Sequence, residues 1–194
     1  SGKLHVFGRH VSLTGSLGSE IQITSVTSTD QRAGVGAYNA TNHQYLVVWA
    51  TSDSKILARR MTGSGVVTTT DTILLSSNTS IDTPDVVYLD STTQYLAVWK
   101  DNRSAGTSGS DIYGRLVTPV GSTNGSEFVI SNHSASETVP RLTLSANGGA
   151  WVVWQRNNGV TTGQDLYARE LNDNGQPIGT TLTIYEDVPN PDVD

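Results

Sequence analysis

The stretch QYLVVWA at residues 44–50 returns as QYLAVWK at residues 94–100 and as AWVVWQ at residues 150–155. Each copy is a short, unbroken run of aromatic and β-branched residues bounded by polar turns, which is typical of a strand covered on both faces. A helix would need a longer periodic segment. The stretch therefore predicts a buried strand, and its recurrence predicts a repeated structural unit.

Other short strands accompany each of these runs. One strand precedes the run across a connector of hairpin length, as PDVVYL at residues 84–89 precedes QYLAVWK. A strand with a central arginine follows the run, and a fourth strand, such as SEFVIS at residues 126–131, follows a glycine-containing turn. The arginine strand has four copies, HVFGRHV, KILARRM, DIYGRLV and DLYAREL, which begin at His5, Lys55, Asp111 and Asp165. The predicted unit is thus four antiparallel strands, named A, B, C and D in chain order.

The period of this unit decides the fold class. Four-stranded units that repeat at about 50 residues are typical of propeller blades, whereas tandem immunoglobulin-like sandwiches repeat at about 100. We therefore predict an all-β protein, a β-propeller with four-stranded antiparallel blades, over residues 1–187. The expected parts, about three and a half blades, are a half-blade of strands C and D at 1–24 and complete blades at about 31–78, 82–132 and 138–187. Residues 188–194 are either an ordinary linker or the start of a further blade.

The combined pattern of Pro-x-Val-x-Tyr, Tyr-Leu-x-Val-Trp, Asp-Ile-Tyr-Gly-Arg and Phe-x-Ile-Ser resembles the blade repeats of bacterial secreted and cell-surface β-propeller proteins. The resemblance covers nearly the whole chain. It implies an extracellular or cell-surface location, and it leaves the ligand open because propellers host many unrelated functions. The first blade departs from the pattern with Gly34, where the other blades have Pro84 and Pro140, and the third blade has Ala150 in place of the tyrosine.

Composition excludes several classes of partner. A formal net charge of −6 disfavours nucleic acid and anionic membrane surfaces. The chain has no cysteine and therefore no disulfide or thiolate metal site, and no apolar run approaches the roughly 20 residues of a membrane helix. The four histidines lack metal-ligand spacing, and the common nucleophile, phosphate-loop and dinucleotide motifs are missing. We expect no cofactor and no metal.

An open row of three and a half blades exposes strand edges and apolar sheet faces. We therefore expect either self-association of the chain or further blades from a longer polypeptide.

Two sets of residues repeat at equivalent positions in the blades. The arginines are either a ring of anion-binding guanidinium groups or structural residues that hold carbonyl groups and carboxylates, and their presence in every unit favours the structural role. The repeated residues are Trp49, Trp99, Trp154, Arg9, Arg59, Arg115 and Arg169.

Long polar loops suggest a ligand site. In a propeller the B-to-C and D-to-A connections emerge on one face, so loops at 100–111 and 155–165 are expected together, flanked by residues 131–138 with His133 and Glu137. The residues predicted to form a polar rim able to hydrogen-bond a glycan are Asp101, Asn102, Arg103, Arg156, Asn157 and Asn158. The alternative, favoured by the glycine content, is that these loops are simply solvated.

The leading functional hypothesis is a non-enzymatic scaffold or binding module of a larger secreted or surface protein, with glycans or proteins as ligands. The alternative is part of a propeller glycosidase or lyase. Such an enzyme would use carboxylates near the central channel, and Asp85 and Asp192 are the candidates at matching strand A positions, where Val35 and Arg141 stand in the other blades. With no catalytic motif in the sequence, we lean against an enzyme.

Overall fold

The computed structural model describes residues 2–25, 28–68, 72–107, 109–157 and 164–186, and their strands form a two-stranded sheet and three four-stranded sheets. In chain order the strands are β1 (Phe7–Val11), β2 (Leu17–Gln22), β3 (Gln31–Asn39), β4 (Gln44–Thr51), β5 (Lys55–Thr62), β6 (Ile73–Ser77), β7 (Asp82–Leu89), β8 (Gln94–Asp101), β9 (Asp111–Val117), β10 (Thr123–Ser131), β11 (Ser136–Leu144), β12 (Ala150–Asn157), β13 (Asp165–Leu171) and β14 (Pro177–Tyr185).

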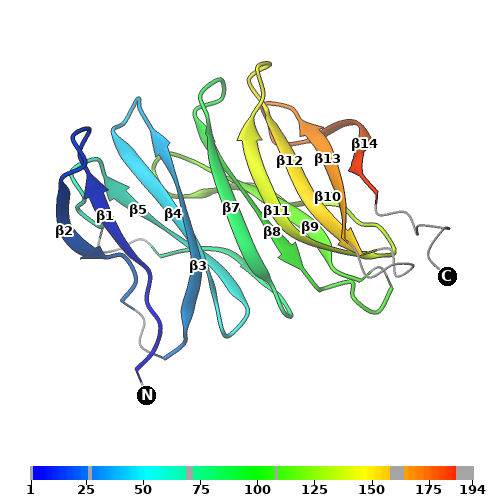
Figure 1. Cartoon of the computed structure of the whole chain (residues 1–194), viewed down its shortest axis with the longest axis horizontal. Coiled ribbons are helices and arrows are strands. Elements are labelled where there is room, and N and C mark those ends of the chain that lie inside the picture. The colour runs from blue at the N-terminus through cyan, green and yellow to red at the C-terminus, as the bar shows by residue number, and fades with distance from the viewer. Residues whose placement is uncertain (1, 26–27, 69–71, 108, 158–163, 187–194) are drawn as a thin grey trace, which may run out of the picture.

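Every sheet is antiparallel and is ordered as its strands follow one another in the chain. We call the β1–β2 sheet the half-blade, and the sheets β3–β6, β7–β10 and β11–β14 the first, second and third blades. Figure 1 shows them fanned out in a row, with the half-blade at one end and the third blade at the other. The A strands β3, β7 and β11 pack against one another, and the D strands are farther apart. The prediction of an all-β propeller with about three and a half blades is confirmed.

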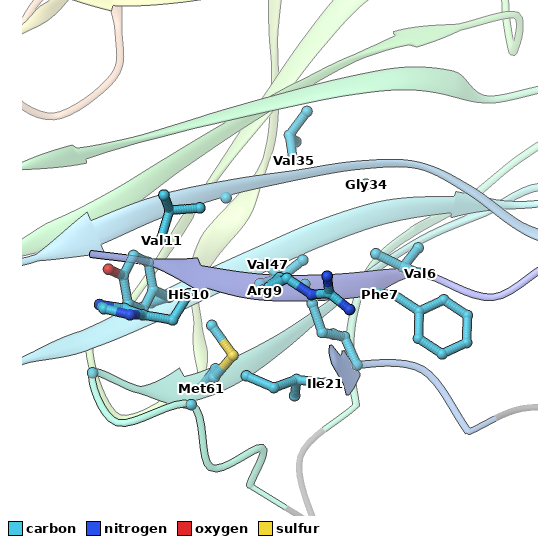
Figure 2. A pocket seen from close by; sticks show the side chains of 16 residues that line it. Val6, Phe7, Arg9, His10, Val11, Ile21, Gly34, Val35, Val47 and Met61 are labelled. Atoms are coloured by element: carbon cyan, nitrogen blue, oxygen red, sulfur yellow. The ribbon is translucent and has the colours of Figure 1, made fainter. Parts of the chain in front are cut away.

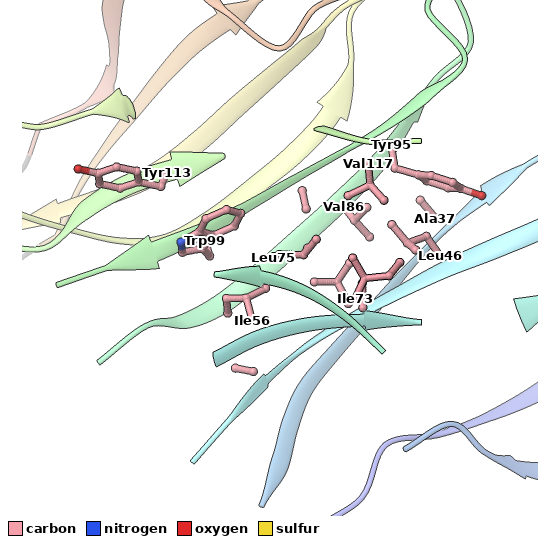
Figure 3. Packing of buried hydrophobic residues seen from close by; sticks show 14 of the residues in the cluster. Ala37, Leu46, Ile56, Ile73, Leu75, Val86, Tyr95, Trp99, Tyr113 and Val117 are labelled. Carbon is pink, nitrogen blue, oxygen red and sulfur yellow. The ribbon is translucent and has the colours of Figure 1, made fainter. Parts of the chain in front are cut away.

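Strand B of the first and second blades is buried on both faces because a neighbouring sheet covers each side of these blades. In β8, Ala97 and Trp99 pack in a hydrophobic cluster with the first blade, and the alternate residues Leu96 and Val98 pack in a cluster with the third blade. Figure 3 shows the first of these clusters, where Trp99 lies near side chains of the first blade such as Leu75. The unbroken apolar run in the sequence is therefore a consequence of this double packing.

The repeated arginines of strand C join adjacent blades. The guanidinium groups of Arg59, Arg115 and Arg169 each donate a hydrogen bond to a main-chain carbonyl of the preceding sheet. These carbonyls belong to Ile23 at 2.8 Å, Leu75 at 2.9 Å and Ile130 at 2.9 Å, respectively. A second nitrogen of each guanidinium donates a hydrogen bond near the start of strand D of the same blade. The acceptors are the Thr72 hydroxyl and the main-chain carbonyls of Gly125 and Gly179, respectively. Because one planar fork holds two sheets, the arginine fixes the distance between blades.

The departure at Gly34 has a steric cause. A Cβ atom at this position would lie 2.5 Å from Cγ1 of Val6, which belongs to the segment leading into β1. No proline ring fits in that space. The first blade therefore differs from the others where the half-blade packs against it.

No helix in the described residues is long and apolar enough to cross a membrane.

Candidate functional site

The three innermost strands share a bulge near their first residues. The strand pairing shifts between Arg32 and Val35 in β3, and it shifts at the equivalent positions of β7 and β11. In each bulge one residue other than glycine has a positive φ: Ala33 at 53°, Thr83 at 48° and Val139 at 51°. A positive φ is costly for β-branched residues such as threonine and valine, and backbone strain of this kind concentrates at functional sites. The bulges therefore mark the candidate site.

Charged side chains gather at these bulges and cross from blade to blade. The guanidinium of Arg32 on β3 lies 3.8 Å from the carboxylate of Asp82 on β7, and both side chains are substantially exposed, at 48% and 37%. Asp82 also accepts a hydrogen bond of 2.7 Å from the main-chain N–H of Thr83. This leaves the Asp82 carboxylate accessible to a ligand, with a cation beside it.

Asp85 lies on the same strand and is held more tightly. One carboxylate oxygen accepts the N–H of Val86 at 2.9 Å, and the other accepts the N–H of Leu142 on β11 at 2.8 Å. Asp85 thus joins the second and third blades. Arg141, at the equivalent position in the third blade, is exposed and donates to the carbonyl of its neighbour Pro140. Asp192, which the sequence pairs with Asp85, lies outside the described residues.

Sequence reasoning missed Arg32 and Asp82. It aligned strand A on the apolar residues, whereas the strands begin two to four residues earlier, at Gln31, Asp82 and Ser136, with a bulge that the apolar pattern does not mark. The only signal available was the charged residue that stands two positions before the glycine or proline in the first two blades.

The predicted polar rim is not assembled as expected. Asp101 is fully buried at the end of β8, where it accepts hydrogen bonds from the indole N–H of Trp99 at 3.2 Å and from the Arg103 guanidinium at 2.6 Å. The Arg103 guanidinium also bonds Glu127 and lies 3.9 Å from the ring centre of Tyr113. The two carboxylates, Asp101 first, raise the pKa of Arg103 further above its ordinary value.

The third blade has an equivalent arrangement around Glu137. This buried carboxylate accepts hydrogen bonds from the Trp154 indole at 2.7 Å, from Ser131 Oγ at 2.7 Å and from Arg156 Nη2 at 2.7 Å. The Arg156 guanidinium is itself buried and lies 3.9 Å from the ring centre of Tyr167. Asp101 is therefore an interior residue that anchors Trp99, and Arg156 is an interior residue paired with Glu137, the anchor of Trp154. This corrects the assignment of Asp101 and Arg156 to an exposed rim. The physical reason is that the indole N–H needs an acceptor in the interior.

The remaining rim residues have different positions. Asn102 is half-buried and Asn157 is exposed at the end of β12, so an exposed polar surface at these loops is smaller than the sequence predicts. Asn158 lies outside the described residues. Binding of a glycan by Asn102 and Asn157 stays a prediction.

A cavity of about 410 Å³ lies between the half-blade and the first blade. Figure 2 shows it lined by β1 residues such as Phe7 and Val11, with Val35 and Val47 of the first blade. The half-blade has no strands A and B, and in the second blade this space next to strand C is filled by β8. The cavity therefore lies at the position that strand B occupies in a complete blade.

In the described part of the chain, no three His, Cys, Asp or Glu side chains are grouped as metal ligands.

No family model matches the chain, and no curated protein sequence matches it. Several solved structures are similar in fold. An endo-arabinase from Bacteroides thetaiotaomicron has a TM-score of 0.62 at 14% identity, over 79% of this chain and 55% of its own. A thermostable family-43 glycoside hydrolase has a TM-score of 0.57 at 10% identity, over 84% and 55%. A puromycin hydrolase has a TM-score of 0.56 at 16% identity, over 86% and 27%. The chain spans about half the length of the first two.

These similarities correct the leading functional hypothesis. Glycoside hydrolases recur among the similar structures, including an arabinase, a xylanase and a galactosidase. They contradict the expectation of a non-enzymatic scaffold or binding module. That expectation was drawn from the absence of catalytic motifs, and scattered carboxylates leave no short motif in a sequence.

Proposed function

We propose that the chain forms part of the channel wall of a secreted, glycoside-processing β-propeller. The observation that carries the proposal is the accessible carboxylate of Asp82, set beside Arg32 at a strained bulge of the innermost strands. The recurrence of glycoside hydrolases among proteins of similar fold supports it. Because the chain spans about half of those enzymes, the activity belongs to the complete propeller.

The chemistry of the site suits a polyhydroxylated substrate. A carboxylate accepts hydrogen bonds from sugar hydroxyl groups, and guanidinium groups donate to them, so Asp82, Arg32 and Arg141 together offer both kinds of contact. Glycosidic cleavage needs a second carboxylate across the sugar from the first. Asp85 is a poor candidate for this role because both its oxygens accept main-chain N–H groups. We assign Asp85 as a positioning residue that holds β11 against β7.

The substrate class follows from the same reasoning. An exposed charged pair at the innermost strands fits neutral pentose chains of the arabinan and xylan type, which present hydroxyl groups and no charge. A polymeric substrate of this kind is met outside the cell, which agrees with the location implied by the repeat pattern.

The test compares Asp82→Asn with Asp90→Asn in titration calorimetry with arabino- and xylo-oligosaccharides. Asp90 is the matched control because it is an exposed aspartate one residue beyond the other end of the same strand. We expect Asp82→Asn to weaken binding at least about tenfold, as loss of a charge-assisted contact does, and Asp90→Asn to have no effect. Equal binding by the wild type and both variants, or no binding by the wild type, would contradict the proposal.

A further inference from the structure

Thr83 follows Asp82 directly at the bulge of β7. Its main-chain N–H donates a hydrogen bond of 2.7 Å to the Asp82 carboxylate. The residue is half-buried and has a left-handed backbone conformation, with a φ of 48°. Because β7 packs against β3 on one side and β11 on the other, the surroundings of Thr83 lie within the described blades.

The side-chain hydroxyl of Thr83 is buried and unpaired. Its oxygen is shielded from solvent, and it has no hydrogen-bond partner among the described residues. A polar group in this position costs free energy, because it gives up hydrogen bonds to water and receives none from the protein. Buried polar groups are almost always paired in folded proteins, so this exception requires a specific explanation.

The bulge itself does not need a hydroxyl group at this position. The equivalent residues of the other bulges are Ala33 in β3 and Val139 in β11, which adopt the same left-handed conformation, with φ angles of 53° and 51°. Valine has nearly the shape of threonine, with a methyl group in place of the hydroxyl. Of the three left-handed residues, only the one beside the Asp82 carboxylate carries a hydroxyl, so this group is a property of the candidate site and not of the bulge.

We infer that Thr83 is a further ligand-binding residue, whose hydroxyl bonds a hydroxyl group of the glycan that Asp82 binds; this inference rests on the proposed function. Thr83 is half-buried, so part of the residue meets solvent although its hydroxyl does not. A rotation of about 120° about χ1, from one staggered rotamer to another, takes the hydroxyl away from its buried position. A sugar hydroxyl then supplies the partner that the protein does not, and binding recovers the cost of the unpaired group.

The adjacency of the two residues defines the part of the sugar that they recognise. Consecutive Cα atoms are about 3.8 Å apart, so Asp82 and Thr83 can bond hydroxyl groups on neighbouring carbons of one ring. The carboxylate only accepts hydrogen bonds, whereas the threonine hydroxyl both donates and accepts. The pair therefore suits a vicinal diol, which the pentose units of arabinan and xylan chains present.

The test measures the affinity for arabino- and xylo-oligosaccharides by titration calorimetry, and the melting temperature without ligand. Thr83→Val removes the hydroxyl and keeps the shape of the side chain, whereas Thr83→Ser keeps the hydroxyl. Thr123→Val is the control, because Thr123 is a half-buried threonine that pairs with Val117 at the opposite end of the second blade. Asp82→Asn is measured beside them.

We expect Thr83→Val to weaken binding about five- to tenfold, which is the effect of one lost hydrogen bond. Its melting temperature should rise by about 2–4 °C, because the unpaired hydroxyl is gone. Thr83→Ser should bind within about twofold of the wild type, as a retained hydrogen bond requires, and Thr123→Val should bind as the wild type does.

Wild-type affinity in Thr83→Val overturns the inference, and so does an equal loss of affinity in Thr83→Ser and Thr83→Val. A lower melting temperature of Thr83→Val also overturns it, because the hydroxyl would then stabilise the free protein. If Asp82→Asn weakens binding in any of these cases, the proposed function stands and only the role of Thr83 fails. A wild type that binds no oligosaccharide overturns both.

Discussion

At the scale of single residues, the tryptophan of strand B needs an acceptor for its indole N–H, and the three blades supply it differently. Trp49 donates to the neutral amide of Gln31, Trp99 to Asp101 and Trp154 to Glu137. Where the acceptor is a carboxylate, an arginine pairs with it and its guanidinium lies over a tyrosine ring of strand C. A charged acceptor in the interior is therefore paired with an arginine, whereas the amide acceptor is not.

Replacement of Glu137 by glutamine should test this rule. The amide still accepts from Trp154, but Arg156 loses its counter-charge while it stays buried. We expect a loss of about 3 kcal/mol in the free energy of unfolding, measured by denaturant titration, because a buried charge is left uncompensated. The double variant Glu137→Gln, Arg156→Met should recover part of that loss, since it imitates the neutral arrangement of the first blade. A double variant less stable than Glu137→Gln alone would show that the cation was not the source of the cost.

Tyr95 gives the chain a sensitivity to alkaline pH. The residue is fully buried between the first two blades, and its hydroxyl is 3.4 Å from the Gln44 carbonyl. Desolvation raises the pKa of Tyr95 from 10.0 to about 12. Because the folded pKa lies above the unfolded one, the neutral phenol stabilises the fold fully below pH 10.0, and this contribution is lost as the pH rises to about 12.

Each unit of pKa corresponds to about 1.4 kcal/mol, so the full effect is about 3 kcal/mol. We expect the free energy of unfolding to fall by about 2 kcal/mol of this between pH 10.0 and about 12, because the two titrations extend beyond the interval. Denaturant titrations at several pH values should show a shallower fall for Tyr95→Phe than for the wild type. Tyr185→Phe, in which the replaced ring is exposed, is the control and should follow the wild type. If the free energy of unfolding fell equally with pH in Tyr95→Phe and the wild type, another residue would cause the alkaline sensitivity.

At the scale of the strand, the sequence predicts strand B and its hairpins but not the bulges of strand A. The apolar run of strand B is visible because both its faces are buried, and the hairpins around it follow from turn residues. A bulge leaves no such mark, because it shifts the pairing by means of backbone angles. The positions of Arg32 and Asp82 therefore could not be deduced, and the burial of Asp101 and Arg156 was hidden for a related reason: polar residues at the end of a strand are usually exposed.

The strain in these bulges is measurable at Ala33, which has a φ of 53° and an exposed side chain. A left-handed conformation costs a residue other than glycine about 1–2 kcal/mol, so Ala33→Gly should raise the free energy of unfolding by about 0.5–1 kcal/mol after the entropy loss of glycine. Ala40→Gly, in an exposed turn without a positive φ, should lower it instead. Thermal and denaturant unfolding of the two variants provide the comparison, and equal destabilisation by both would mean that the bulge is unstrained.

At the scale of the whole molecule, the repeat period was sufficient to predict the architecture. Four strands of this length can bury both faces of strand B only between two neighbouring sheets, and this condition leads to a propeller. Function was less accessible, because the blade interfaces and the tryptophan anchors contain most of the charged residues that the sequence makes conspicuous. The candidate site depends on the few residues at the bulges of the innermost strands that serve neither purpose.

The joint between blades pairs a side chain on one sheet with a main-chain carbonyl on the next, and this asymmetry bears on how such a chain can evolve. Every amino acid supplies a carbonyl, so this hydrogen bond does not restrict the residue at the accepting position, and it is apolar packing that keeps Ile23, Leu75 and Ile130 alike. A duplicated blade brings its own arginine and needs no matching substitution in the blade that receives it. For this hydrogen bond, the gain, loss or exchange of a whole blade therefore needs no second mutation in the neighbouring blade.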